Sequence, residues 1–454
     1  MPDEDLPPDS PTRPPAGPAG TPRIKRFAKM AFPMLLLAWL ALMFWNSAKP
    51  LPPGTHTVSL TSRLSESDID FLYGSTRSSD APARELSAID HAEQLIVIDR
   101  SPVGRELALR LLARKRARPN LKILLVTDPG NEAFGGTPAH YLTTLEKAGI
   151  IVARVRLDRL RDSNPLYSGA WRLLFGWWSD PFDEPPEQVT LRTWSRMRNS
   201  KADRRQLMMA DDGSGGWTAV IAPGAAAVLT LRGSLARSMI ASELQIAAWS
   251  TDDDRLPPAP QMDMRGVGSI DARFLSEGAI ASALLDAIAA AGRDDEISIA
   301  VENLSDRRLI AASLGAAARG ARLQVLLARN RIPNQAVAGE LLRDGGVRSG
   351  GRIEVRWYPI EQRASHPALL IVRHRTDLWM NLGSANFTRR SLGDLNLETG
   401  VELRMPARAA PARAVTDYFA AIWSSASADT DTADVSALDY WRYRIAEATG
   451  LSSF

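Results

Sequence analysis

The sequence has no cysteine and only five histidines among its 454 residues. Without cysteine, the chain can form no disulfide framework, no thiolate nucleophile, and no cysteine-based zinc site or iron–sulfur cluster. It also lacks an excess of one charge, since 55 Lys and Arg against 52 Asp and Glu leave a formal net charge of +3. Because nucleic-acid binders need a basic field, no nucleic-acid partner is expected. The 45% of hydrophobic residues suffices for one large core or two medium ones.

The N-terminal region combines a proline-rich tail with an apolar run. Residues 1–29 are predicted to be a disordered cytoplasmic tail, and residues 30–48 a single transmembrane anchor followed by a linker, 49–60. Basic residues gather before the apolar run and only Lys49 comes just after it, which places the N-terminus in the cytoplasm. The alternative is a cleaved signal peptide, but Asn46-Ser47-Ala48 is a poor cleavage site. We therefore expect a protein of the inner (cytoplasmic) membrane whose main domain is periplasmic.

Beyond the linker, one order of elements occurs twice. Strand, helix and strand patterns at 94–99, 104–117 and 121–128 return at 296–302, 306–320 and 321–329. Each half continues with a further strand (149–157 and 351–359) and ends in a strand–turn–strand pattern (204–224 and 366–386). Alternation of strands and helices favours mostly parallel sheets covered by helices. The sequence predicts an α/β protein of two similar lobes, 61–255 and 265–454, the latter including C-terminal helices.

The first half carries an insertion, residues 158–199, that the second half lacks. Its segment LYSGAWRLLFGWWSDPF is rich in tryptophan, tyrosine and phenylalanine. Such rings either pack under the insertion as a satellite core or lie at a membrane–water boundary, where aromatic side chains are enriched. The sequence leaves both interpretations open.

The second half contains the best chemical signal. His366 opens a predicted strand, the run Gly383-Ser384-Ala385-Asn386 ends the following strand, and Glu398 comes shortly after. This arrangement resembles the phospholipase D superfamily, whose bilobal members carry one His-x-Lys-x4-Asp motif in each half and a Gly-Ser-x-Asn run after it. The wider chain, including segments such as LLARKRARPNLKILLVTDPGN and YWRYRIAEATGLSSF, is similar to the bacterial cardiolipin synthase-like branch over roughly residues 50–454.

The resemblance implies a bilobal α/β fold of two similar mixed sheets flanked by helices. It also implies a phosphodiester chemistry that needs two imidazoles. One histidine attacks phosphorus, and the other protonates the leaving alcohol before water or a second alcohol completes hydrolysis or phosphatidyl transfer. Lysines, with the serine and asparagine, hold the phosphoryl oxygens, and a carboxylate orients each histidine. The resemblance implies no metal and no cofactor. Membrane phospholipids are the implied partners, and a protein partner is also open.

In the second half, the motif is only partly kept. His366 stands in the histidine position, but Ala368 replaces the lysine and Arg373 the aspartate. By the resemblance, Ser384 and Asn386 are substrate-phosphate holders, and Glu398 is the carboxylate that orients a histidine. A structural alternative for His366 is a hydrogen-bonded residue at the start of a buried strand.

In the first half, the motif is almost gone. Arg204 replaces the histidine and Gln206 the lysine, and Asp211 alone is preserved. A guanidinium stays protonated near neutral pH, so Arg204 can neither attack phosphorus nor carry a proton, although it can bind phosphate, as can Arg373. Loss of a catalytic nucleophile or its partner costs on the order of 10⁴- to 10⁶-fold in turnover.

The sequence therefore predicts a membrane-anchored phospholipase D-like protein that is catalytically impaired and binds phospholipid or phosphate. The first alternative is an active phosphodiesterase or phosphatidyltransferase that uses His366. The second is a non-catalytic scaffold for protein interactions.

Overall fold

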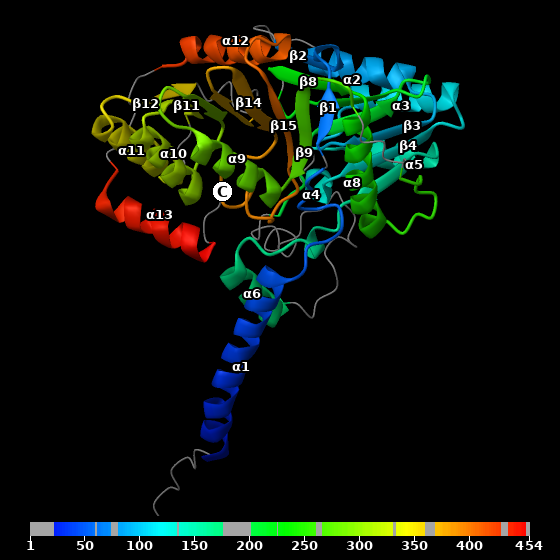
Figure 1. The fold of residues 1–454 in the computed structure, drawn as a ribbon. Helices are drawn as coiled ribbons and strands as arrows, with labels where there is room; N and C mark the ends of the chain where they lie inside the picture. The colour runs from blue at the N-terminus through cyan, green and yellow to red at the C-terminus, as the bar shows by residue number, and fades with distance from the viewer. Residues whose placement is uncertain are drawn as a thin grey trace, which may run out of the picture.

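The computed structural model describes residues 22–59, 61–73, 80–133, 136–175, 201–224, 226–259, 266–329, 333–358, 368–427 and 435–450. Within these ranges the fold has two mixed sheets flanked by helices, and one long N-terminal helix, as the sequence predicts. Figure 1 shows the two sheets side by side in one body, with the N-terminal helix projecting away from it.

The first lobe is built on a seven-stranded sheet in the order β2-β8-β7-β6-β3-β4-β5. Its central strands are continuous apolar runs: all five residues of β3 are buried, as expected for a strand covered on both faces. The elements are β2 (Ile69–Tyr73), α2 (Asp80–His91), β3 (Leu95–Asp99), α3 (Arg105–Ala117), β4 (Lys122–Thr127), α4 (Pro129–Ala133), α5 (Ala139–Lys147), β5 (Ile151–Arg154), η2 (Leu157–Arg159), α6 (Pro165–Phe175), β6 (Leu207–Asp211), β7 (Trp217–Ile221), β8 (Ala227–Arg232) and α8 (Ser234–Ser250).

The second lobe is built on an eight-stranded sheet in the order β1-β9-β15-β14-β13-β10-β11-β12. Without β1, this order matches that of the first sheet strand for strand. The elements are β1 (Ser62–Leu64), η1 (Glu66–Asp68), β9 (Ile270–Ser276), α9 (Gly278–Ala290), β10 (Glu296–Val301), α10 (Arg307–Arg319), β11 (Arg322–Ala328), α11 (Pro333–Arg348), β12 (Ile353–Tyr358), β13 (Ala368–Arg373), β14 (Asp377–Gly383), β15 (Thr399–Pro406), α12 (Ala410–Ser425) and α13 (Ala437–Thr449).

The short strand β1 crosses the lobe boundary that the sequence suggests. Ser62 and Leu64 pair with Ala272 and Ile270 of β9, so residues 62–64 extend the second sheet although they lie within the predicted first lobe, 61–255. The segment just before β9 lies so close to β1 that a Cβ at Gly268 would meet the Leu64 carbonyl oxygen at 1.8 Å. The chain thus enters the body through the second lobe before it builds the first.

Three clusters of buried side chains hold the layers together. One lies between the first sheet and its outer helices, and another between the second sheet and its outer helices. The third runs through the middle and includes side chains of both sheets, of α8 and of α12, for example Met239 and Tyr418. Because this cluster is shared, the two lobes are packed against each other over a continuous apolar core.

The N-terminal helix α1 (Pro22–Ala48) includes the predicted anchor, 30–48, but begins eight residues before it, within the segment predicted to be disordered. Its segment Ala31–Ala48 is long and apolar enough to cross a membrane, a test that a signal sequence also passes. In Figure 1, α1 leaves the body as a single rod, and α6 packs against the end of α1 that is nearer the body.

Candidate functional site

The Gly-Ser-Ala-Asn run lies where β14 ends at the junction between the lobes. A Cβ at Gly383 would lie 1.9 Å from the Thr399 carbonyl oxygen, so glycine is needed for β14 and β15 to approach here. The Ser384 hydroxyl donates to Glu398 Oε2 at 2.6 Å, and its oxygen accepts from the Thr399 N–H at 3.0 Å. Ser384 is half-buried and Glu398 fully buried. The structure therefore brings together two of the predicted site residues.

Glu398 is in an environment that favours its neutral form. Burial raises the pKa of Glu398 to about 7, although the Arg204 guanidinium and the Ser384 hydrogen bond act in the opposite direction. The Glu277 carboxylate adds to the rise, and its Oε1 accepts the Glu398 backbone N–H at 2.9 Å. A carboxyl group with such a pKa can exchange a proton near neutral pH.

Asn386 lies in the same loop but holds the backbone together. Its Oδ1 accepts from the Asn303 N–H at 3.2 Å, and the Phe387 N–H donates to the Asn303 carbonyl at 2.9 Å. Asn386 is buried. These bonds fix the loop against the segment that follows β10, and so fix the position of Ser384 two residues earlier.

Arg204 reaches this site from the other lobe. Its backbone N–H donates to the Leu397 carbonyl at 3.0 Å, and the Leu397 N–H donates to the Ala202 carbonyl at 3.0 Å. These bonds form a parallel bridge between Asp203 and Leu397. The side chain of Arg204 is exposed. The structure thus places an arginine, in the motif position of a histidine, beside Glu398 at the lobe junction.

Two further arginines of the second lobe were missed by the motif analysis. Arg390 is buried, and burial, together with the nearby Arg204 and Arg389 guanidinium groups, lowers its pKa to about 10. Both residues belong to the segment FTRRS, which directly follows the Gly-Ser-Ala-Asn run. Their position next to a recognised run was the available signal. With Arg204, they give the junction a local excess of positive charge.

The other motif positions are not gathered at this site. Ala368 pairs with Gly383 at one end of β13, whereas Arg373 lies at the opposite end, about 16 Å away at the usual rise per strand residue. There Arg373 is half exposed and lies 3.7 Å from Glu296. The structure therefore does not bring Arg373 together with Ser384, because the five positions between the lysine and aspartate positions of the motif span a whole strand. His366 lies outside the described residues.

In the first lobe, the side chains of Gln206 and Asp211 form hydrogen bonds with backbone groups. The Gln206 side-chain amide donates to the Ser101 carbonyl at 2.7 Å. The carboxylate of Asp211, at the far end of β6, accepts four backbone N–H bonds, three of them at the start of β3 and the fourth from Gly213. Asp211 is buried. The one preserved member of this motif thus fixes the register of two strands.

Between Gln206 and Arg204 lies Arg205, whose role the sequence did not reveal. It is fully buried and donates to Glu243 Oε1 at 2.5 Å, to Glu277 Oε1 at 2.7 Å and to the Gly54 carbonyl at 3.0 Å. The two carboxylates keep the pKa of Arg205 above its usual value despite burial. One guanidinium thereby joins the first lobe, the second lobe and the linker.

More carboxyl groups surround this arginine. Burial raises the pKa of Asp99 and of Asp203 well above the usual value. The Glu243 carboxylate adds to both rises, and Asp203 also adds to that of Asp99. Within the ranges that the structure describes, no group of three or more His, Asp or Glu side chains is arranged to hold a metal ion. The cluster is therefore an internal network of acids around one base.

The site loop is tied to the end of α1. The Arg389 guanidinium donates to the Ser163 carbonyl, and the neighbouring Asp162 N–H donates to the Asn46 carbonyl at 3.0 Å. The ring Nδ1 of His56, in the linker, lies 2.8 Å from the Asp394 carboxylate. The His56 backbone N–H donates to Glu277 Oε2 at 2.7 Å. The arginines of the junction consequently lie near the point where the apolar helix enters the body.

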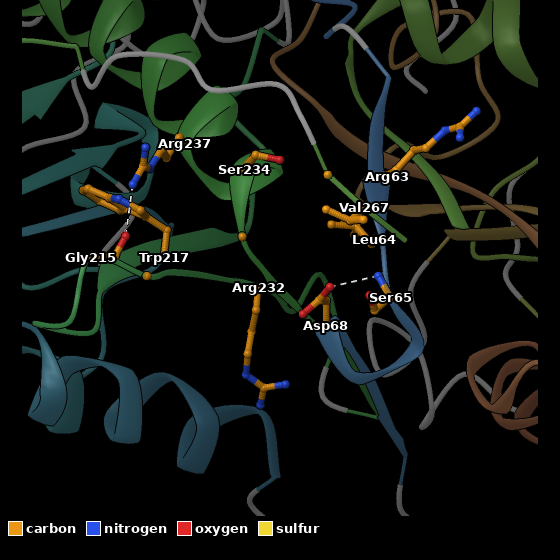
Figure 2. A pocket seen from close by; sticks show the side chains of 13 residues that line it. Arg63, Leu64, Ser65, Asp68, Gly215, Trp217, Arg232, Ser234, Arg237 and Val267 are labelled. Atoms are coloured by element: carbon orange, nitrogen blue, oxygen red, sulfur yellow. Dashed lines mark hydrogen bonds between the residues drawn. The ribbon is translucent and has the colours of Figure 1, made fainter. Parts of the chain in front are cut away.

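A cavity of about 350 Å³ opens at the other end of the strands, between β1, β7 and β8. Figure 2 shows that its arginines do not converge: Arg63 and Arg232 point away from each other, and Arg237 lies over Trp217 and donates to the Gly215 carbonyl. Arg232 donates to the Ser67 carbonyl at 3.1 Å. The cavity therefore lacks a preformed anion site and is separate from the junction.

Comparisons with known proteins agree with this geometry. Residues 284–423 match the family model described as cardiolipin synthase, phospholipase D-like domain. The crystal structure of phosphatidylserine synthase from Haemophilus influenzae shares 12% identity, with 92% of this chain and 99% of that chain covered and a TM-score of 0.59. Nuc from Salmonella typhimurium, a phospholipase D family member, shares 18% identity over 34% of this chain and 97% of its own, with a TM-score of 0.29. No curated protein sequence matches the chain.

Residues 284–423 of the second lobe thus resemble the phospholipase D-like domain named for cardiolipin synthases, and the two-lobed chain shares its fold with phosphatidylserine synthase over most of its length. The predicted resemblance to the phospholipase D superfamily is confirmed for this domain and for the fold.

Proposed function

We propose that this chain is a membrane-anchored phospholipase D-like protein that binds the phosphate of phospholipid head groups without the two-histidine reaction. The observation that carries the proposal is Arg204, which lies beside Glu398 in the motif position of the first histidine. A guanidinium can hold a phosphate through two parallel hydrogen bonds, but it can neither attack phosphorus nor transfer a proton.

The charges at the junction support phosphate binding. Arg204, Arg389 and Arg390 lie close enough that the other two lower the pKa of Arg390. An anion between them would relieve this repulsion. The Ser384 hydroxyl, held by Glu398, adds a neutral donor and acceptor at the same loop. The site has the composition of a phosphate-binding site and lacks an imidazole from the first lobe.

The apolar helix α1 favours a lipid ligand over a soluble one. Residues Ala31–Ala48 are apolar enough to span a bilayer, and the Asp162 and Ser163 backbone links the end of that helix to Arg389. A protein anchored through α1 would hold the junction near the head groups. The charge pattern around the apolar run favours a cytoplasmic N-terminus and a periplasmic body.

Binding is tested with the full chain in phosphatidylcholine nanodiscs, titrated with glycerophosphoglycerol, the soluble phosphodiester head group of phosphatidylglycerol. Removal of a charged hydrogen-bond partner costs about 1.5–3 kcal/mol, so Arg204→Ala should weaken binding about 10- to 100-fold. Arg204→Lys should recover part of the affinity. Arg373→Ala, which removes an arginine at the far end of β13, is the matched control and should bind like the wild type.

Turnover is measured separately, as head-group release or exchange in phosphatidylglycerol and cardiolipin liposomes. We expect no release above the level of His366→Ala. Head-group release that disappears in His366→Ala would show an active one-histidine enzyme and overturn the proposal that the protein is catalytically impaired. Equal affinity of the wild type and Arg204→Ala for glycerophosphoglycerol would contradict a phosphate site at Arg204 and favour a scaffold for protein interactions.

A further inference from the structure

The helix α6, from the insertion of the first lobe, is packed against the apolar helix α1. The Trp39 indole N–H donates to the Leu166 carbonyl at 3.1 Å. A Cβ at Gly169 would lie 3.0 Å from Trp39 Cδ1 and 3.2 Å from Met43 Cβ, so the absence of a side chain brings the two backbones together. Small residues at such contacts are the usual means by which helices approach closely within membranes.

The contacts also give the level of α6 along α1. The Asp162 N–H bonds the Asn46 carbonyl near the end of α1, whereas the Leu166 carbonyl bonds Trp39. Seven helical residues separate Asn46 from Trp39, which corresponds to about 10 Å at a rise of about 1.5 Å per residue. Since the apolar segment ends at Ala48, the beginning of α6 lies alongside the membrane-spanning segment and not above it.

A belt of charges marks the level at which this pair of helices meets water. The Lys201 ammonium lies 2.8 Å from the buried Asp162 carboxylate, and the Arg172 guanidinium on α6 also donates to it. The Arg161 Nε donates to the Lys49 carbonyl at 2.9 Å. Arg172 thus reaches from α6 back towards the end of α1, as long basic side chains do when their helix lies in the apolar region.

The far end of α6 presents apolar side chains to its surroundings. Ser168 and Gly169 are buried against α1, whereas Leu174 is 60% and Phe175 43% exposed. On α1, Phe44 and Trp45 are exposed as well, by 63% and 71%. Both helices of this packed pair therefore carry exposed apolar surface.

We propose that α6 is a second membrane-contacting element, inserted in the leaflet on the side of the body, with lipid acyl chains covering Leu174 and Phe175. This inference rests on the anchoring role proposed for α1. Two elements in the bilayer fix the tilt of the body, which a single helix does not, and they hold the arginines of the junction towards the head groups. The described part of the insertion, helix α6, thus serves to orient the body.

The lack of cysteine makes this surface directly measurable. Single cysteines placed at Leu174, at Leu37 on α1 and at Val347 on α11 can each carry a nitroxide, because all three side chains are exposed. The full-length chain is reconstituted in phosphatidylglycerol–phosphatidylcholine liposomes. Collisions with oxygen, which concentrates in lipid, are compared with collisions with a water-soluble nickel chelate by electron paramagnetic resonance.

The inserted helix predicts an oxygen-to-nickel collision ratio at Leu174 several-fold above that at Val347 and close to that at Leu37. A Leu174 ratio equal to the Val347 ratio, with a lipid-like ratio at Leu37, would overturn the insertion of α6 and leave the anchor intact. Water-like ratios at both Leu174 and Leu37 would overturn the anchor as well. Phosphate binding by Arg204 is untouched by either outcome.

The contact between the helices supplies a second variant. Gly169→Leu places a side chain where Trp39 and Met43 lie, and so should separate α6 from α1. We expect the oxygen-to-nickel ratio at position 174 to change at least twofold in this background, whereas the ratio at Leu37 stays constant. An unchanged ratio at position 174 would show that α6 does not depend on α1 for its place in the bilayer and would overturn the two-helix arrangement.

Discussion

At the junction, the second lobe ends its sheet with Ser384 and Glu398, and the first lobe ends the matching edge with Arg204 and Arg205. The two sheets share one strand order, but their chemistry at this edge differs. In the second lobe, a half-buried hydroxyl is bonded to a carboxyl group whose pKa is about 7. In the first lobe, one arginine is exposed, and the next is enclosed by the carboxylates of Glu243 and Glu277.

This difference lies in what the corresponding segments of the two lobes contact. Under the function proposed above, Ser384 of the second lobe and the exposed Arg204 of the first lobe serve a phosphate ligand. The rest of the first-lobe segment is a structural joint, because Arg205 and Asp211 bond the protein itself. Variants of the buried Arg205 and Asp211 should therefore harm folding, whereas a variant of the exposed Arg204 should harm ligand binding only.

The largest effect is expected for Arg205→Ala. Its removal leaves Glu243 and Glu277 buried without their counter-charge, and breaking such a pair costs about 3–5 kcal/mol of the free energy of unfolding. Urea unfolding followed by circular dichroism measures this cost. The neighbouring Arg204→Ala is the control and should change stability by less than about 1 kcal/mol, because that side chain is exposed. Equal urea midpoints of unfolding for the two variants would show that the ion pairs of Arg205 do not stabilise the protein.

A smaller effect concerns Glu398 and pH. Its pKa is raised from 4.5 to about 7 in the folded protein, so the folded state keeps a proton that the unfolded chain loses. The stabilisation is complete below pH 4.5 and is lost as the pH rises through 7; at about 1.4 kcal/mol per unit of pH it amounts to on the order of 3 kcal/mol. The raised pKa values of Asp99, Asp128 and Asp203 act in the same direction.

The measurement is the free energy of unfolding in urea at pH 5.5, 7 and 8.5. The wild type should be less stable at pH 8.5 than at pH 5.5, and Glu398→Gln, which cannot ionise, should lose part of this decline. A wild type that gains stability between pH 5.5 and 8.5 would contradict the assignment of neutral carboxyl groups at the junction.

The next effect concerns the preserved aspartate of the first lobe. Asp211→Ala removes the acceptor of the Glu93, Gln94 and Leu95 backbone N–H groups and leaves the buried Leu95 N–H unpaired, which costs about 1–3 kcal/mol. Thermal or urea unfolding should show this loss. Binding of glycerophosphoglycerol by the folded variant should not change, since Asp211 lies at the far end of β6. Weaker binding without a loss of stability would assign Asp211 to the ligand site instead.

Much of the fold could be predicted because the strands are continuous apolar runs with amphipathic helices between them. The sequence ranges 94–99 and 296–302 correspond to β3 and β10 within one residue at either end. The pairing of β1 with the second sheet could not be predicted in the same way, because a three-residue strand carries no periodicity and its partner lies some 200 residues further along the chain.

The site was predictable to a lesser extent. A recognised run located Ser384, and motif spacing located Arg204, because these signals are local. The enclosure of Arg205 depends on Glu243 and Glu277, which belong to different lobes and share no motif with it. Motif spacing also misled, because it grouped Arg373 with Ser384 although a six-residue strand separates them. Residues several positions apart on one strand lie far apart in space, so two positions of a motif need not belong to one site.

The smallest effect should follow from this last point. Arg373→Ala changes the same motif position in the second lobe that Asp211 occupies in the first. Its only recorded ion pair within the described residues is with Glu296 at 3.7 Å, and both side chains are 53% exposed. Exposed pairs of this kind contribute about 0–1 kcal/mol, so urea unfolding should barely distinguish the variant from the wild type, and binding of glycerophosphoglycerol should be equal. A tenfold loss of binding in Arg373→Ala, with stability unchanged, would mean that the phosphate site reaches the far end of β13 and that the two lobes differ less than their contacts indicate.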